Sequence, residues 1–346
     1  MKENEITSMK KAIVLFSGGL DSLLAYLIMN KQVHCELLHF DHGFRSSTNY
    51  NKITEFATKF LNAKLHIMDV SKEYVNVLLN PKDGYGKYMN PCVDCHAFFL
   101  RKAWEFCKDN DFDFLVSGEV LGQRPKSQIK CQLTKVTNMS GCGDYIVRPL
   151  SAKLLTPSLP EREGWVDRTK LYNIEGRSRK RQNKILSEFG YTLLNNLTIP
   201  QGGCLLIDDS VSVRLKLINE LVGYEPRFNF MLRVGRLFNV NGTLLLVGKN
   251  KRENEIIASE FKNISDKFLY IEPLAKFGEI NKAPICLVEI NKCVEDLITA
   301  VEIAVSYADK IDMGVLKVLG DNGYGLTLLS EVEQKNKSEF EKYLIK

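Results

Sequence analysis

The stretch Phe16-Ser17-Gly18-Gly19-Leu20-Asp21-Ser22 joins a strongly apolar run to the start of a helical pattern. Residues 12–16 predict a buried parallel strand, and a helix is expected to begin near Ser22. Paired glycines at such a junction let the backbone approach a phosphate, whose charge is held by unpaired N–H groups at the helix N-terminus. The sequence therefore predicts an anion site, with hydroxyl donors on Ser17 and Ser22 and a carboxylate on Asp21 for a magnesium ion.

This spacing differs from both the GxxxxGK[ST] loop and the GxGxxG turn. It resembles the SGGxDS loop of the PP-loop (N-type) ATP pyrophosphatases, which adenylate a substrate and release pyrophosphate. The alternative is an ordinary Gly-Gly turn between a strand and a helix. The resemblance implies that ATP and Mg²⁺ are cofactors and that the loop binds the ATP phosphates. The implied ATP-binding residues of the loop are Ser17, Gly18, Gly19, Leu20, Asp21 and Ser22.

Length and composition are those of an ordinary globular protein with a buried core. The 346 residues are 45% hydrophobic and 26% charged, which predicts two domains. No apolar run reaches the roughly 18 residues of a membrane span, and the polar N-terminus lacks a signal-peptide core. A cytoplasmic protein without a membrane partner is expected. The nine cysteines do not form a secreted disulfide framework, and Cys35 and Cys107 are expected in the core.

Residues 10–40 predict a strand, the loop, a helix and a second strand over 35–40. A βαβ unit of this length favours an α/β fold with a doubly wound parallel sheet, which binds ligands at the carboxyl ends of its strands. Phe40 ends the second strand, and we expect the adenine to bind there. His39 and His42 could act in the site, but polar loop residues are the favoured interpretation.

The pattern predicts further elements along the first 150 residues. Helices are expected over 49–62 and 97–104, and an irregular loop covers 80–91. Strands are expected over 64–70, 112–117 and 145–151.

Two groups of cysteines could carry chemistry. Cys92 and Cys95 form a Cys-x-x-Cys at a helix N-terminus, where thiol pKa values are expected to be depressed and the pair could bind metal or form a disulfide. A zinc site would usually need a second such pair, and the sequence has none. Cys204 follows Gly202-Gly203 in an accessible turn.

Three motifs resemble the pyrophosphatase domain of tRNA 4-thiouridine synthetase, in the same order along the chain. These are Cys92-x-x-Cys95, the Gly118-Glu119-x-Leu121-Gly122-Gln123 turn followed by Ser127-Gln128, and Arg148-Pro149-Leu150. The tRNA 2-thiouridylases are more distant relatives, which carry an aspartate where this chain has Cys92. The resemblance covers about residues 10–210. It implies an adenylation and sulfur-transfer domain over 1–210, with Gly118 and Glu119 also at the ATP site.

The resemblance implies ATP-dependent RNA thiolation, with tRNA as the partner and Asp21, Cys95 and Cys204 as catalytic residues. A [4Fe-4S] cluster held by Cys92, Cys95 and Cys204, with sulfide on its open iron, is the favoured version. In the competing version, a carrier protein supplies a persulfide to Cys204, and Cys95 resolves it as a disulfide. That version needs no cofactor beyond Mg-ATP.

Residues 176–184 contain five basic side chains and no acid. Such a segment can line a phosphate backbone, and the alternative is a solvated helix face. The predicted RNA-binding residues are Arg148, Arg177, Arg179, Lys180 and Arg181. Arg124 and Arg148 could each face phosphates. Only about ten residues precede the first strand, whereas 4-thiouridine synthetases carry a tRNA-binding region there, so RNA recognition is expected from the basic segment, the C-terminal domain or a partner.

Residues 211–346 predict a smaller α+β domain. A short helix over 213–218 is expected to lead into a β-hairpin within 228–250, whose first strand covers 231–238 and whose turn is Asn241-Gly242. This hairpin, the Glu253-Asn254 helix start, a strand over 284–288 and a helix over 294–308 resemble the NFACT RNA-binding module. A dimerisation domain, giving a homodimer, is the alternative.

Two other functions remain open from the sequence. The acceptor of the adenylate could be a small-molecule carboxylate, with the cysteines holding structural Zn²⁺. Alternatively, the protein could be a non-catalytic RNA-binding factor in which ATP acts as a switch.

Overall fold

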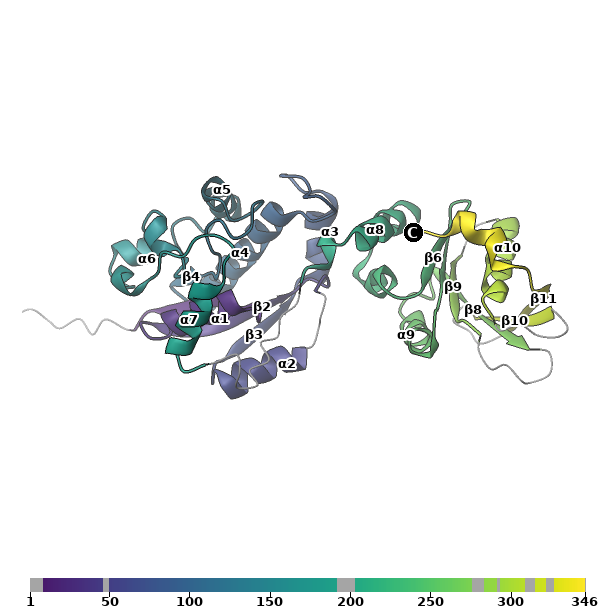
Figure 1. Ribbon diagram of the computed structural model, residues 1–346, viewed down its shortest axis with the longest axis horizontal. Helices are drawn as coiled ribbons and strands as arrows, with labels where there is room; N and C mark the ends of the chain where they lie inside the picture. The colour runs from purple at the N-terminus through teal and green to yellow at the C-terminus, as the bar shows by residue number, and fades with distance from the viewer. Residues whose placement is uncertain are drawn as a thin grey trace, which may run out of the picture. The chain divides into compact units, whose positions relative to one another are not determined.

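In the computed structural model the chain forms two compact units, Met1–Ile207 and Asp208–Lys346. The predicted boundary after residue 210 falls beside this division. The structure describes residues 9–45, 50–191, 203–275, 283–290, 293–308, 315–321 and 327–345 (Figure 1). Within these ranges, no helix combines the length and the apolar character needed to cross a membrane.

The first unit is built on a five-stranded parallel sheet with the order β3-β2-β1-β4-β5. β1 lies at its centre and pairs with β2 on one side and β4 on the other. The loop that follows β1 therefore opens at the middle of the carboxyl edge, where doubly wound sheets bind ligands. The predicted parallel α/β sheet is confirmed. Its strands are β1 (Lys11–Leu15), β2 (His34–Asp41), β3 (Leu65–Asp69), β4 (Phe114–Val116) and β5 (Ile146–Val147).

Helices cover both faces of this sheet (Figure 1). Ala12 and Val14 of β1 share a buried cluster with side chains of α1, α2 and α7. α4 packs on the opposite face, against β1 and β4, with α3 and α5 beside it. The helices are α1 (Leu20–Met29), α2 (Tyr50–Glu55), which continues as a π-helical turn (Phe56–Phe60), α3 (Ser71–Leu79), α4 (Cys92–Asp109), α5 (Lys130–Ser140), α6 (Leu159–Arg162) and α7 (Lys180–Glu188).

Several helices of the first unit differ from the prediction. α1 begins at Leu20, two residues before Ser22, and α3 and α5 lie where no helix was predicted. α4 begins at Cys92 rather than near residue 97, so both cysteines lie in its first turn. Pro91 precedes this turn and Asp94 adds negative charge to it, and both features favour a helix N-terminus.

The second unit is a six-stranded antiparallel sheet with the order β11-β10-β8-β9-β7-β6, and α10 packs on it. Its strands are β6 (Arg236–Val240), β7 (Thr243–Val247), β8 (Phe268–Ala275), β9 (Cys286–Glu289), β10 (Val315–Asp321) and β11 (Thr327–Glu333). Its helices are α8 (Asp209–Val222), α9 (Lys251–Phe261) and α10 (Val294–Ser306).

The predicted Asn241-Gly242 hairpin turn is confirmed between β6 and β7. Both residues have positive φ, 49° and 95°, as a two-residue turn of type I′ requires. The first strand begins later than predicted, because Pro226–Leu232 forms a 3₁₀ helix opened by a proline at its first position. α8 is longer than the short helix predicted over 213–218.

Candidate active site

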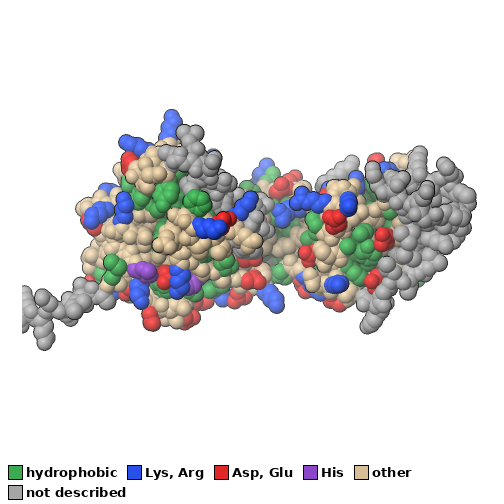
Figure 2. Space-filling view, turned by 90° about the horizontal axis from the view of Figure 1, so that it is seen from below, with side chains coloured by type: hydrophobic (Ala, Val, Ile, Leu, Met, Phe, Trp, Pro, Cys, Tyr) green, Lys and Arg blue, Asp and Glu red, His purple; other side chains and the backbone are tan. Residues whose placement is uncertain are grey.

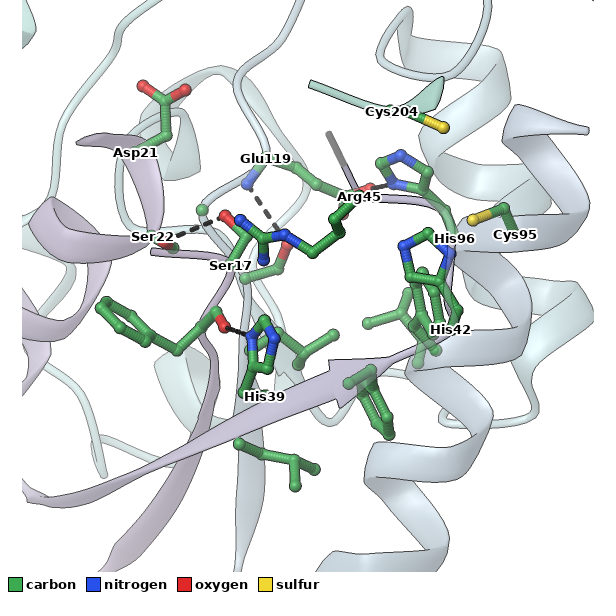
Figure 3. A pocket seen from close by; sticks show the side chains of 18 of the residues that line it. Ser17, Asp21, Ser22, His39, His42, Arg45, Cys95, His96, Glu119 and Cys204 are labelled. Atoms are coloured by element: carbon green, nitrogen blue, oxygen red, sulfur yellow. Dashed lines mark hydrogen bonds and ion pairs between the residues drawn. The ribbon is translucent and has the colours of Figure 1, made fainter. Parts of the chain in front are cut away.

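A cavity of about 310 Å³ opens at the carboxyl ends of β1, β2 and β4 in the first unit (Figure 3). The predicted phosphate loop, the end of β2, the start of α4 and the turn after β4 all contribute to it. So does the segment of residues 203–207, called the Cys204 segment below. The lining residues are Leu15, Phe16, Ser17, Asp21, Ser22, Leu38, His39, Phe40, His42, Arg45, Cys95, His96, Phe99, Leu100, Ser117, Gly118, Glu119, Arg124, Gln128, Gly203 and Cys204.

The loop after β1 has the local structure of an anion site. Gly18 has a φ of 73°, a conformation that favours glycine, and Gly19 caps the N-terminus of α1 without a side-chain hydrogen bond. The Ser17 and Ser22 hydroxyls lie 3.2 Å apart, and the Ser22 hydroxyl donates to the Gly19 carbonyl at 2.8 Å. The first N–H groups of a helix have no partner within it, and here two hydroxyls lie beside them, as anion binding requires. Leu20, predicted with this loop, is buried in the core and does not line the cavity.

Asp21 is held by residues from two distant segments. Its Oδ2 accepts a hydrogen bond of 2.9 Å from Gln123 Nε2 and forms an ion pair of 3.8 Å with the Arg179 guanidinium. Its Oδ1 is buried and has no hydrogen-bond partner within the described part of the chain. A carboxylate oxygen with free lone pairs beside a phosphate site fits Mg²⁺, which prefers oxygen ligands.

Two aromatic side chains, Phe40 and Phe99, line another part of the cavity. Phe40 is 8% exposed and stacks on Phe99 of α4, with ring centroids 5.1 Å apart. Both rings line the cavity, as the predicted adenine position near Phe40 requires.

His39 and His42 are not the polar loop residues favoured from the sequence. His39 belongs to β2, is 1% exposed, and its Nδ1 lies 2.8 Å from the Phe16 carbonyl oxygen. His42 follows β2, is 9% exposed and lies among the rings of Phe44, Tyr74 and Phe99. Burial lowers the pKa of each imidazole to about 4, because a charged ring would lose its hydration. Both side chains line the cavity as neutral groups at pH 7.

The three predicted sulfur ligands lie on one side of this cavity. Cys95 and Cys204 line it, and Cys92 is near enough to act electrostatically on both thiols. The Cys204 segment is held against the chain after β2, because Leu205 N–H donates to the Phe44 carbonyl at 2.9 Å.

The predicted depression of the thiol pKa is wrong for Cys95. Burial raises the pKa of this thiol, and neighbouring Cys204 and Cys92 raise it further. Burial also raises the pKa of Cys204, although the Arg124 guanidinium opposes the shift. Desolvation therefore outweighs the effect of the helix N-terminus at Cys95. Cys35 and Cys107 are buried core residues, as predicted.

The described residues include no group of three Cys, His, Asp or Glu side chains arranged to hold one metal ion. Cys92 Sγ instead accepts a hydrogen bond of 3.1 Å from Asn90 Nδ2. A [4Fe-4S] cluster spreads its thiolate ligands over several iron atoms, so two thiols at the cavity with Cys92 close to both fit it in donor chemistry.

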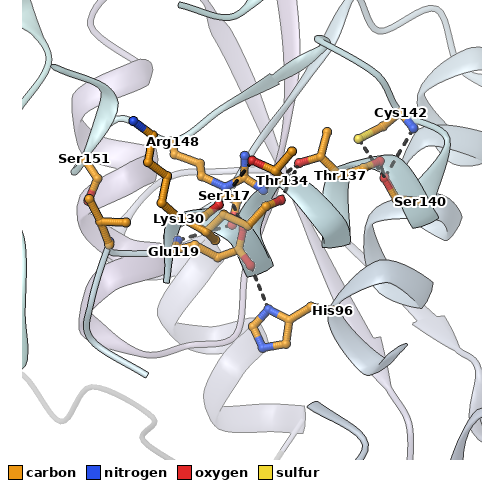
Figure 4. Close-up of polar contacts among 12 residues, drawn as sticks. His96, Ser117, Glu119, Lys130, Thr134, Thr137, Ser140, Cys142, Arg148 and Ser151 are labelled. Carbon is orange, nitrogen blue, oxygen red and sulfur yellow. Dashed lines mark hydrogen bonds and ion pairs between the residues drawn. The ribbon is translucent and has the colours of Figure 1, made fainter. Parts of the chain in front are cut away.

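Sequence reasoning missed a buried polar network behind the cavity (Figure 4). Glu119 Oε1 pairs with His96 Nδ1 at 2.8 Å, and its Oε2 pairs with Arg148 Nε at 2.8 Å. Burial alone would raise the pKa of Glu119, but Arg148 and His96 outweigh it and lower the pKa to about 2. This network orients His96 at the cavity wall. The position of His96 directly after Cys95 was the available signal.

The same network corrects the role predicted for Arg148. Its side chain is 9% exposed, and it also donates to the Thr137 hydroxyl at 3.1 Å. Arg148 is therefore enclosed with Glu119 rather than presented to an RNA backbone. Arg124 is exposed at the cavity.

The other predicted RNA-binding residues, Arg177, Arg179, Lys180 and Arg181, are all exposed, as is Lys184. α7 begins at Lys180, so most of these cations lie just before or in its first turn. Positive charge at a helix N-terminus opposes the helix dipole, and a bound anion would relieve that repulsion. On the face shown in Figure 2, basic and acidic side chains are interspersed.

Comparison with known proteins shows which families the N-terminal part of the chain resembles. Residues 7–153 match the family model described as thiamine biosynthesis protein (ThiI). A probable tRNA sulfurtransferase from Finegoldia magna is 28% identical over 155 residues, which cover 42% of this chain and 37% of that protein. A tRNA-specific 2-thiouridylase, MnmA, from Petrotoga mobilis is 31% identical over 133 residues, which cover 33% of this chain and 36% of that protein. The chain thus spans little more than a third of each relative.

A solved structure of a predicted subunit of tRNA methyltransferase from Methanocaldococcus jannaschii covers 57% of this chain and 97% of that chain. Its identity is 15% and its TM-score is 0.31, a likeness too distant to bear on function. The resemblance of the C-terminal residues to the NFACT module stays a prediction. The sequence matches support a PP-loop domain within residues 7–153, similar to the corresponding domains of tRNA sulfurtransferases and 2-thiouridylases.

Proposed function

We propose that this protein is an ATP-dependent RNA thiolase that acts on tRNA. One observation carries the proposal: a single cavity is lined by Ser17, Asp21 and Ser22 of the phosphate loop and by the thiols of Cys95 and Cys204. Activation of a base carbonyl and delivery of sulfur to the same carbon require both groups at one place.

In the first step, a base carbonyl oxygen attacks the α-phosphorus of ATP. The bond between the α-phosphorus and the oxygen that bridges it to the β-phosphorus breaks. That oxygen keeps the electron pair of the broken bond and leaves as part of pyrophosphate. The product is an O-adenylated base, whose oxygen now leaves readily as AMP. Ser17, Ser22 and the N-terminus of α1 bind the departing phosphates. Asp21 would hold Mg²⁺, which would supply positive charge beside them.

Gly118 and Glu119 were predicted to bind ATP, and we assign both of them supporting roles instead. Gly118 braces the phosphate loop through its backbone, as its close approach to Asp21 requires. Both oxygens of Glu119 are engaged by His96 and Arg148, so we assign Glu119 the orientation of His96 rather than a contact with ATP.

In the second step, sulfur replaces the adenylated oxygen. We favour exogenous sulfide, which forms a bond to the activated carbon while the carbon–oxygen bond breaks and AMP leaves. No net oxidation occurs in this route. Cys92, Cys95 and Cys204 would hold a [4Fe-4S] cluster, which supplies one iron without a protein ligand as a binding position for sulfide.

The competing route uses a persulfide on Cys204. Its terminal sulfur attacks the activated carbon and AMP leaves. The Cys95 thiolate then attacks the Cys204 sulfur and releases the thionucleoside, which leaves a Cys95–Cys204 disulfide. Two electrons from an external thiol reductant are needed before the next turnover.

We assign RNA binding to the exposed cations Arg177, Arg179, Lys180 and Arg181, which lie in the same unit as the cavity. Cations that neutralise phosphates bind RNA without reading its sequence, so the target nucleotide is selected elsewhere. The NFACT-like C-terminal unit is our candidate for that selection.

A paired measurement of pyrophosphate and thionucleoside tests the proposal. Cys204→Ala should still release pyrophosphate in the presence of ATP and tRNA, but it should form no thionucleoside, as seen by nucleoside mass spectrometry. Cys131→Ala, at an exposed cysteine on α5, is the matched control and should retain both products. An unchanged thionucleoside profile in tRNA from a strain lacking the protein would reject thiolation and favour a small-molecule acceptor.

Iron and acid-labile sulfide, measured per chain after anaerobic purification, separate the two sulfur routes. The cluster route predicts about four of each. A colourless, iron-free protein that still thiolates RNA would exclude the cluster and leave the persulfide route.

A further inference from the structure

Arg45 has no role in the steps above, yet it is one of the most enclosed charges of the cavity. Its residue is 8% exposed and follows the end of β2. Its backbone pairs with that of Cys204 in an isolated antiparallel bridge. Figure 3 shows the side chain extending from that wall into the cavity, on the same side as Ser17.

The guanidinium has an unpaired N–H and one attracting carboxylate among the described residues. Arg45 Nε is buried and has no hydrogen-bond partner among the residues that the structure describes. Asp41 attracts the guanidinium, but its Oδ1 already accepts a hydrogen bond of 2.9 Å from Gly43 N–H. The neighbouring His39 and His42 offer no negative charge. A largely buried cation with an unpaired N–H is unfavourable unless an anion enters the site.

We propose that Arg45 binds the phosphate that remains on the adenylate, the α-phosphate of the bound nucleotide. This inference rests on the proposed function and adds a binding residue to it. A guanidinium is suited to the role because its planar N–H fork matches two phosphate oxygens and stays charged when buried.

The position of Arg45 decides which phosphate it binds. The loop of Ser17 and Ser22 with the α1 N-terminus occupies one end of the cavity, and the Phe40–Phe99 stack lines another part of it. The loop takes the pyrophosphate and the rings take the adenine, so the α-phosphate lies between them. Arg45 lies beside Cys204 through the backbone bridge. Binding there places the AMP leaving group next to the sulfur side of the cavity.

Equilibrium binding of AMP, adenosine and pyrophosphate to Arg45→Met in the full chain tests this assignment. Methionine is flexible and apolar, so it fills the position without a charge. We expect AMP affinity to fall roughly 10- to 100-fold, since a charge-assisted hydrogen-bond pair is lost. Adenosine and pyrophosphate affinities should change less than about threefold, and Arg45→Lys should recover part of the AMP affinity. Arg101→Met, at an exposed arginine of α4 that does not line the cavity, is the matched control.

Thermal stability separates binding from a structural role. Loss of an unpaired buried charge should leave the Tm of the nucleotide-free protein unchanged or higher, while the rise in Tm with AMP should shrink. Unchanged AMP affinity in Arg45→Met would overturn the inference. An equal loss of AMP and adenosine affinity would overturn it as well, and so would a variant that loses only RNA affinity. Wild-type protein that binds AMP but never releases pyrophosphate from ATP would reject the proposed function while leaving the Arg45 assignment standing.

Discussion

The backbone of Gly118 lies directly against that of Asp21. A Cβ atom at Gly118 would lie 2.7 Å from the carbonyl carbon and oxygen of Asp21 and from the amide nitrogen of Ser22. The turn after β4 and the phosphate loop after β1 therefore form one packed unit, although about 100 residues separate them along the chain.

Gly118→Ala should displace the phosphate loop, because backbone atoms cannot move aside as a flexible side chain would. We expect a loss of about 1–3 kcal/mol of folding stability, as for other overpacked positions. The rate of pyrophosphate release should fall at least tenfold further than the loss of folded protein accounts for. Gly164→Ala is the control, since Gly164 has a φ of 70° but open space around its Cβ position. It should lose stability by backbone strain alone, and full activity in Gly118→Ala would contradict the packing argument.

Asp21→Asn should impair ATP cleavage while leaving the fold intact. The amide keeps the size of the side chain but removes the charge that would hold Mg²⁺ beside the phosphates. Pyrophosphate release should fall roughly 10²–10³-fold, the range for loss of one preorganised electrostatic contact. A titration with Mg²⁺ should show a weaker apparent affinity. Asp167→Asn, at the N-cap of an exposed 3₁₀ turn, should change neither quantity.

Arg148→Met should destabilise the protein, because it leaves the Glu119 carboxylate buried without its guanidinium partner. Breaking a buried pair typically costs about 3–5 kcal/mol. The double variant with Glu119→Gln should recover much of this loss, which urea unfolding of the four proteins measures as a coupling energy. Arg162→Met removes an exposed pair with Asp144 and should cost no more than about 1 kcal/mol.

The Arg148 effect should also depend on pH. The pKa of Glu119 is lowered to about 2 in the folded protein, so its ionised form contributes stability above the ordinary value of 4.5. That contribution is lost as pH falls from about 4.5 toward 2. In Arg148→Met the guanidinium no longer opposes burial, so we expect the pKa of Glu119 to rise and the carboxylate to bind a proton more readily in acid. The destabilisation measured at pH 5 should therefore be smaller than at pH 7.

His42 should make folding stability sensitive to mild acid. Its pKa is about 4 when folded against an ordinary value of 6.5, so the unfolded chain binds the proton first. Stability from this group is present above about pH 6.5 and is lost as pH falls toward 4. His42→Phe should reduce the loss of stability between pH 7 and pH 5, measured by urea unfolding.

The cluster before and within the first turn of α7 should contribute sequence-independent RNA affinity. The double variant Arg177→Gln/Lys180→Gln should weaken tRNA binding at low salt. The slope of log K against log salt should become shallower by about 1 for each lost phosphate contact. Lys108→Gln/Lys170→Gln removes two exposed cations elsewhere on the same unit and is the control. Equal effects from both pairs would indicate a general charge effect and no binding surface.

The sequence by itself determined the fold of the first unit and the position of the phosphate loop. An apolar strand, a Gly-Gly turn and a helix start are local patterns, and the chemistry of Ser17, Asp21 and Ser22 follows from their place in them. The Asn241-Gly242 turn could be predicted for the same reason, because both residues tolerate positive φ.

Only the tertiary structure decided which side chains meet and how water is excluded from them. Burial reversed the expected pKa shift of Cys95, and distant Tyr74 and Cys204 act on the same thiol. Pairing with Glu119 enclosed Arg148, and the bridge to Cys204 placed Arg45 in the cavity. Each of these contacts joins residues that are distant in the chain. Packing determines the charge and the hydration of the side chains there, and a local sequence pattern does not contain that information.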